Sequence, residues 1–153
     1  MNKITLDNEY RALENLFETK YPTLKVLSYN PPEPNFFDVV FELIDSSTEE
    51  VNRAITEKLR TYQLLFHFEK RTTAMEYHSK VDALLEETAS LPCQGRFIKL
   101  HNHSMSRIFS TASGKHAFYC LIEASYHSAR TFAQAPKMQE ITHVMNGIET
   151  TIN

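Results

Sequence analysis

Residues 60–132 constrain the fold more than any other part of the chain, because a long aromatic strand, a helix and two further strands follow one another there with little linker. In the first strand, large apolar residues at every second position alternate with polar ones, which is the pattern of a strand with one buried face. The apolar positions are Tyr62, Leu64, Phe66 and Phe68. We expect this face to lie on the core of the domain.

A helix is predicted directly after that strand. Thr73 and Glu76 have the spacing of a capping box, and apolar residues recur after them at helical intervals. Pro92 and Gly95 are residue types that end helices, so we expect the helix to run up to them.

Two more strands are predicted beyond the helix, over residues 97–103 and 116–132. The segment between them, residues 104–115, is rich in serine, which is typical of a hairpin-like connection. Ile108 and Phe109 are expected to extend one strand into this connection.

The first part of the chain shows three more elements. Apolar residues at helical spacing over residues 6–19, preceded by Thr5 as a capping residue, predict an amphipathic helix. A short strand over residues 24–29 and a half-buried strand over residues 35–44 are expected to follow. Residues 45–58 are polar and charged, so we interpret them as a mobile loop or a helix of one to two turns.

These elements predict one α+β domain over residues 1–153. Most connections are too short for parallel crossovers, so we expect an antiparallel or mixed sheet of four to five strands with two main helices packed on one face. Residues 133–153 form a C-terminal tail in this prediction. Its apolar spacing over residues 137–152 suits either a helix or a strand.

Composition excludes several classes of function. The 153 residues are 42% hydrophobic and 23% charged, which is ordinary for a globular domain. No window reaches the roughly 18 apolar residues of a membrane span, and the first residues turn acidic before an apolar signal segment forms. The formal net charge is -3 and no basic run occurs, so the chain has no cluster of positive charges to neutralise the phosphates of a nucleic acid. We expect no membrane partner, no secretory signal and no direct reading of DNA.

The cysteines and glycines carry no recognisable chemistry. Cys93 and Cys120 are too few for a disulfide framework and lack the spacing of a redox or zinc pair. The three glycines are dispersed, which excludes a P-loop or a dinucleotide fingerprint. We predict no catalytic, cofactor-binding or metal-binding residues, no cofactor and no enzymatic activity.

The string His101-Asn102-His103 is the one candidate for a metal site. Simple strand alternation places His101 and His103 on the same face, and a third ligand would have to come from His116 or Glu123. The alternative interpretation is an exposed pair of histidines near a loop.

Aromatic residues are in excess, with 10 Phe, 7 Tyr and no Trp. Adjacent pairs such as Phe36 with Phe37 and Phe118 with Tyr119 place aromatic rings on both faces of a sheet. Two helices on one side would not cover that much apolar surface, so we expect a homo-oligomer whose interface covers the rest.

The order of these elements resembles the tail-terminator or neck proteins of tailed bacteriophages, which join heads to tails. The resemblance lies in a strand over residues 61–68, a helix over residues 75–91 carrying the run Val81-Asp82-Ala83-Leu84-Leu85, a strand near residues 97–102 and a long strand over residues 116–126. The N-terminal helix and the proline-rich residues 31–34 before an aromatic strand are also similar to that family.

This resemblance implies a structural protein of the virion, assembled in the host cytoplasm. It implies a ring, usually hexameric, that caps the tail tube and meets the head connector or head completion protein. DNA would pass through the ring without specific binding, which suits a weakly acidic chain. Residues 45–58 and 104–115 would then line the channel or contact neighbouring rings.

Two other functions fit the same sequence. The first is a small phage or bacterial protein-binding module, such as an inhibitor of a host defence protein. The second is a small hydrolase that uses a cluster of His101, His103 and His116.

Overall fold

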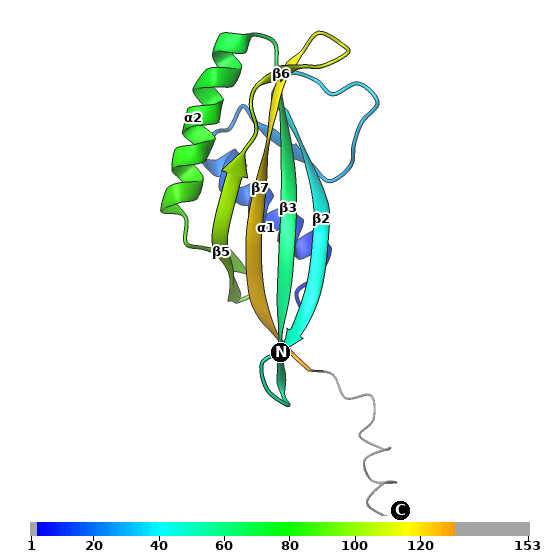
Figure 1. The fold of residues 1–153 in the computed structure, drawn as a ribbon, viewed down its shortest axis with the longest axis vertical. Helices are drawn as coiled ribbons and strands as arrows, with labels where there is room; N and C mark the ends of the chain where they lie inside the picture. The colour runs from blue at the N-terminus through cyan, green and yellow to red at the C-terminus, as the bar shows by residue number, and fades with distance from the viewer. Residues whose placement is uncertain (1–2, 131–153) are drawn as a thin grey trace, which may run out of the picture.

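The protein is described by a computed structural model over residues 3–130, and within that range it forms two helices and seven strands (Figure 1). In chain order these are α1 (Leu6–Lys20), β1 (Lys25–Leu27), β2 (Asp38–Glu50), β3 (Ile55–Phe68), α2 (Arg71–Glu87), β4 (Ser90–Cys93), β5 (Arg96–Met105), β6 (Phe109–Ser110) and β7 (His116–Ala129). The α+β class is confirmed. The predicted number of four to five strands is wrong, because short strands such as β4 and β6 carry too few residues to show a periodic pattern.

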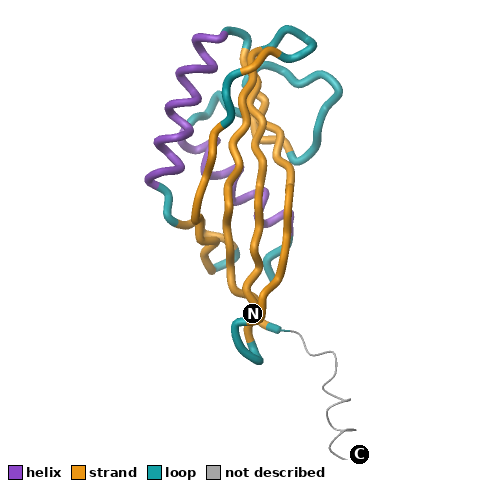
Figure 2. The backbone as a smooth tube through the Cα atoms, in the orientation of Figure 1, coloured by secondary structure: helices purple, strands orange, loops and turns teal. Residues whose placement is uncertain are grey.

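The strands form one mixed sheet in the order β1-β2-β3-β7-β5-β4, with β6 pairing with β7 (Figure 2). Only the pairing of β1 with β2 is parallel, and every other pairing among the described residues is antiparallel. The two longest strands, β3 and β7, pair along their whole length from Ile55 opposite Ala129 to Phe68 opposite His116. They form the spine of the sheet.

Both helices contribute to a single core on one face of the sheet, as predicted. Phe17 of α1 meets the edge of Phe66 with ring centroids 5.8 Å apart, and Tyr77 of α2 stacks on Phe68 at 5.1 Å. Phe118 of β7 stacks on Phe66 at 4.8 Å and so joins the two parts of the core. Every apolar position predicted for the first long strand is fully buried: Tyr62, Leu64, Phe66 and Phe68 are each 0% exposed. Burial of one such side chain stabilises the fold by about 1.5–3 kcal/mol.

The two helix starts differ in how they are capped. At α1 the Thr5 side chain accepts a hydrogen bond from the Asn8 backbone, and the Asn8 side chain accepts one from the Thr5 backbone, so the predicted cap is confirmed. At α2 the helix begins at Arg71, and its N-cap residue Lys70 makes no side-chain capping bond. The predicted capping box at Thr73 is therefore wrong, because that residue already lies inside the helix.

The predicted end of the second helix is also wrong. It ends at Glu87, and Pro92, expected to terminate the helix, lies instead in strand β4, where it pairs with Phe97. Because β4 is at the edge of the sheet, its open side has no neighbouring strand to bond, and a proline without an N–H is tolerated there.

Residues 45–58 are not a loop or a short helix. They continue β2 and begin β3, and these strands stay paired from Asp45 opposite Thr61 to Glu50 opposite Thr56. The turn is held by Asn52, whose Oδ1 accepts hydrogen bonds from the backbone N–H groups of Ala54 and Ile55. The polar composition reflects solvent exposure of a paired hairpin, which lies beyond the ends of the core (Figure 1).

Two predictions fall partly or wholly outside the described residues: the tail over residues 133–153 and the last part of the strand over residues 116–132. Neither described helix is both long enough and apolar enough to cross a bilayer.

Candidate functional site

The two histidines of the His101-Asn102-His103 string lie on opposite faces of the sheet. The register between β5 and β7 shifts there, because Leu100 pairs with Ala124 and Asn102 already pairs with Glu123. His101 is therefore the extra residue of a β-bulge, and the bulge reverses the alternation that follows it. The prediction that His101 and His103 share a face is wrong.

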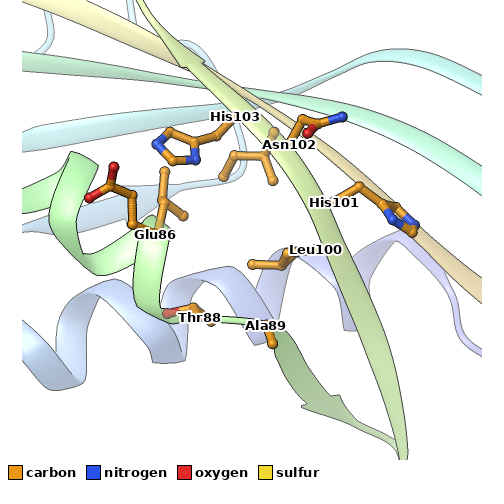
Figure 3. Close-up of a pocket in the computed structure, with 9 residues that line it drawn as sticks. Glu86, Thr88, Ala89, Leu100, His101, Asn102 and His103 are labelled. Atoms are coloured by element: carbon orange, nitrogen blue, oxygen red, sulfur yellow. The ribbon is translucent and has the colours of Figure 1, made fainter.

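Each histidine has its own partner. His103 points toward α2, where its Nε2 lies 2.7 Å from Oδ1 of Asp82. His101 lies on the other side of β5, and its Nε2 is 2.7 Å from Oγ of Ser125 (Figure 3). A hollow of about 470 Å³ lies beside them, between the end of α2 and β5.

The third histidine of the predicted cluster lies far from this hollow. His103 of β5 pairs with Ile122 of β7. His116 lies six residues before Ile122 on β7, which is roughly 20 Å at the rise of a β-strand. Within residues 3–130 no group of three or more His, Cys, Asp or Glu side chains is arranged to hold a metal ion. The hydrolase built on His101, His103 and His116 therefore has no assembled site.

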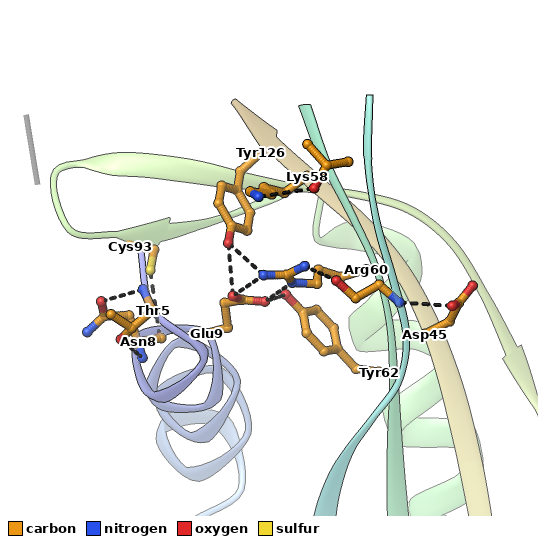
Figure 4. A network of polar contacts seen from close by, with 11 residues as sticks. Thr5, Asn8, Glu9, Asp45, Lys58, Arg60, Tyr62, Cys93 and Tyr126 are labelled. Carbon is orange, nitrogen blue, oxygen red and sulfur yellow. Dashed lines mark hydrogen bonds and ion pairs between the residues drawn. The ribbon is translucent and has the colours of Figure 1, made fainter. Parts of the chain in front are cut away.

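A buried cluster of polar side chains surrounds Glu9 of α1 (Figure 4). Its side chain is fully buried and accepts a hydrogen bond from Arg60 Nε at 2.9 Å. The hydroxyl of Tyr62 donates to the same carboxylate at 2.5 Å, and the hydroxyl of Tyr126 donates to its other oxygen at 3.0 Å. Arg60 also donates to Tyr126 at 3.1 Å and to the Ser46 hydroxyl.

This cluster joins α1 to β3 and β7 and leaves the buried charge satisfied. Burial, and then the negative charge of Glu9, raise the pKa of Tyr126 to about 12 and also raise the pKa of Tyr62. Both hydroxyls therefore stay protonated as donors across the physiological pH range. The Glu9 carboxylate has no exposed surface, so we assign the cluster a role in stability.

Both cysteines are buried free thiols. Burial raises the pKa of the Cys120 thiol to about 12, and it also raises the pKa of Cys93. A thiol with a raised pKa is a poor nucleophile at neutral pH.

An open groove lies between the start of α2 and the connection from β5 to β6. It has a volume of about 550 Å³ and is lined by Arg71, Met75, His78, Ser79, Arg107 and Ile108. We call it the basic groove. Arg71 opens a helix whose first turn holds no acidic residue, so the positive end of the helix dipole adds to the charge of the two arginines.

The face of the sheet opposite the helices is uncovered by any described element (Figure 1). Strand register places Leu65 between Val40 of β2 and Tyr119 of β7, and places Leu121 in the next outward row. Phe109 of β6 lies 6.5 Å from Tyr119. We call the partly exposed residues Leu65, Phe109, Tyr119 and Leu121 the outer patch.

The same face becomes acidic toward the hairpin turn. Glu49 of β2 lies directly opposite Glu57 of β3, and Glu57 is in turn opposite His127 of β7. Like charges directly opposite one another destabilise a pair of strands. We call Glu49 and Glu57 the acidic pair.

Sequence reasoning missed the Glu9 cluster and the basic groove. Glu9 precedes Leu13 and Phe17 at four-residue intervals, so a charged residue on the apolar stripe of the helix was a detectable signal. Arg71 and Arg107 come from separate elements, and no local pattern links them.

No protein-family model matches this chain, and no curated protein matches it. A solved structure that bears no descriptive name is similar over 85% of this chain and 99% of its own, with a TM-score of 0.46 and 11% identity. A likeness of this degree carries no argument about function.

Proposed function

We propose that this protein is a structural component of a tailed-phage virion, which caps the tail tube as a ring, usually of six copies, and joins it to the head connector. The observation that carries the proposal is the outer patch. Apolar side chains on an uncovered sheet face favour association with another protein surface. A second copy of the chain is the simplest such partner, since most oligomers are built from identical subunits.

The order of elements supports the same proposal. The long strand β3, the helix α2, the strand β5 and the long strand β7 follow one another as the resemblance to tail-terminator proteins implies. The hairpin of residues 45–58 and the connection of residues 104–115 lie toward opposite ends of the sheet (Figure 1). Each is therefore available to contact a different neighbour.

The first test is the mass of the purified protein by light scattering, together with negative-stain images. The proposal expects ring-shaped particles of several copies, and it expects these rings to stop the growth of purified tail tubes. A protein that remains a monomer at high concentration and leaves tube length unchanged contradicts it. A monomer that binds one host protein would instead support the binding-module alternative.

A matched pair of variants examines the outer patch. Leu65→Lys with Leu121→Lys places two charges on the patch and is expected to lower the fraction of protein in rings. Ser28→Lys with Asn30→Lys adds the same number of charges at exposed positions after β1, outside the outer patch, and serves as the control. Circular dichroism verifies that each variant is folded.

A further inference from the structure

The basic groove and the acidic pair are two surfaces of opposite charge at opposite ends of the molecule. The start of α2 and strand β6 lie at one end of the long axis, and the turn of the β2–β3 hairpin lies at the other (Figure 1). A contact between them within one chain is therefore excluded by distance. The two surfaces can meet only between two copies of the chain.

The basic groove lacks a counter-charge of its own. Arg71 and Arg107 line the same hollow, and neither guanidinium group forms an ion pair or hydrogen bond within the described part of the chain. Met75, which is 52% exposed, and Ile108 add apolar surface to the same hollow. An occupant that suits this groove has two carboxylates beside a small apolar side chain.

The hairpin end has that combination. Neither carboxylate, of Glu49 or of Glu57, has an ion pair or hydrogen bond among residues 3–130, although the two side chains face each other across the strands. Val51, which follows in the turn, is 49% exposed. Their repulsion would be relieved by cations from outside the chain.

Other charges near the turn do not cancel the acidic pair. Glu50 is satisfied by Arg130 at 3.4 Å. Lys58 donates to Thr48. Arg53 is exposed in the turn itself, so it adds one positive charge at the tip beyond the acidic pair.

We propose that the acidic pair of one copy docks into the basic groove of a second copy. The two surfaces differ, so the contact is head-to-tail, and such contacts generate a closed ring when the rotation between copies closes and a filament when it does not. This inference deepens the proposed function and rests on it for self-association. It adds which surfaces meet and in what direction.

Reversing the charge of each surface separately tests the contact. One variant carries Glu49→Lys with Glu57→Lys, and the other carries Arg71→Glu with Arg107→Glu. In each variant alone the two docking surfaces have the same sign, so self-association measured by sedimentation is expected to weaken at least about tenfold. When the two variants are mixed in equal amounts, each surface meets its opposite again, and assembly is expected to return with both chains in equal numbers.

Lys3→Glu with Lys25→Glu changes the net charge as much as the groove variant does, at exposed positions that belong neither to the basic groove nor to the acidic pair, and should assemble like the wild type. The inference is overturned if the reversed variants assemble like the wild type, if their mixture does not recover, or if the wild type never associates. If a variant does not fold, the salt dependence of wild-type assembly tests the inference instead. Charges are screened within about 3 Å in 1 M salt, so assembly that is unaffected by 1 M salt also overturns the inference.

These outcomes separate the inference from the proposed function. If the wild type forms rings that cap tail tubes and the reversed variants form the same rings equally well, the proposed function is supported and the proposed contact is contradicted. If the reversed variants assemble only when they are mixed, but the wild type does not stop the growth of tail tubes, the proposed contact is supported and the proposed function is contradicted.

Discussion

Nε of Arg60 lies 2.9 Å from Oε1 of Glu9, a residue 51 positions earlier in the chain, and the Glu9 side chain has no exposed surface. The pair fixes the first turns of α1 against the middle of β3. A buried ion pair adds little net stability compared with apolar residues, but removing one partner leaves an uncompensated charge. A position of α1 that separated the pair would leave both charges uncompensated, so the contact favours the observed docking of the helix.

Glu9→Ala is expected to lower the free energy of unfolding by about 3–5 kcal/mol, because Arg60 and two tyrosine hydroxyls lose their acceptor. For a domain of this size each kcal/mol corresponds to roughly 2–4 °C in the melting temperature. Denaturant unfolding measures the loss. The control is Asp7→Ala, which breaks the exposed pair with Arg11 and should cost far less stability. Equal losses for the two variants would contradict the role of the buried pair.

Stability is expected to fall on the alkaline side because of Tyr126. In the unfolded chain this tyrosine loses its proton near its ordinary pKa of 10.0, whereas burial and Glu9 hold the folded pKa at about 12. The stabilisation is therefore complete below pH 10 and is lost as the pH rises from 10 to 12. Over that window the free energy of unfolding of the wild type should fall by about 2 kcal/mol more than that of Tyr126→Phe. Parallel pH profiles for the two proteins would show that the folded pKa is not raised.

The two thiols should differ in reactivity. Cys120 is fully buried with a pKa of about 12, so a thiol reagent is expected to modify it only when the domain unfolds. Cys93, which is 7% exposed and lies near the sheet edge, should react sooner, although more slowly than a free thiol. Time-resolved labelling followed by peptide mass analysis measures both rates. Rapid labelling of Cys120 in the folded protein is the contrary result.

Zinc is expected to leave the melting temperature unchanged, because His101 and His103 face opposite sides of β5 and His116 lies at another part of the sheet. A stabilisation of several degrees that disappears in His103→Ala would show that the histidines do converge on a metal. His103→Ala alone should cost about 1 kcal/mol through loss of the bond to Asp82.

Strand alternation and helical spacing predicted the main elements well. The inward face of β3 and the Thr5 cap of α1 were both confirmed, since each depends on residues close together in the chain. The prediction was wrong for residues 45–58, because the backbone of this polar segment is hydrogen-bonded in the hairpin of β2 and β3. It was wrong at Pro92 as well, because only the tertiary structure shows that this residue lies at a sheet edge.

The sequence by itself determined the class of fold, because the periods of apolar residues decide which faces of each helix and strand must be buried. The tertiary structure alone decided which polar side chains meet. One extra residue at His101 sent the two histidines to opposite faces, and the docking of α1 brought Glu9 to Arg60. Such contacts depend on strand register and helix position, which are set by the packing of the whole core.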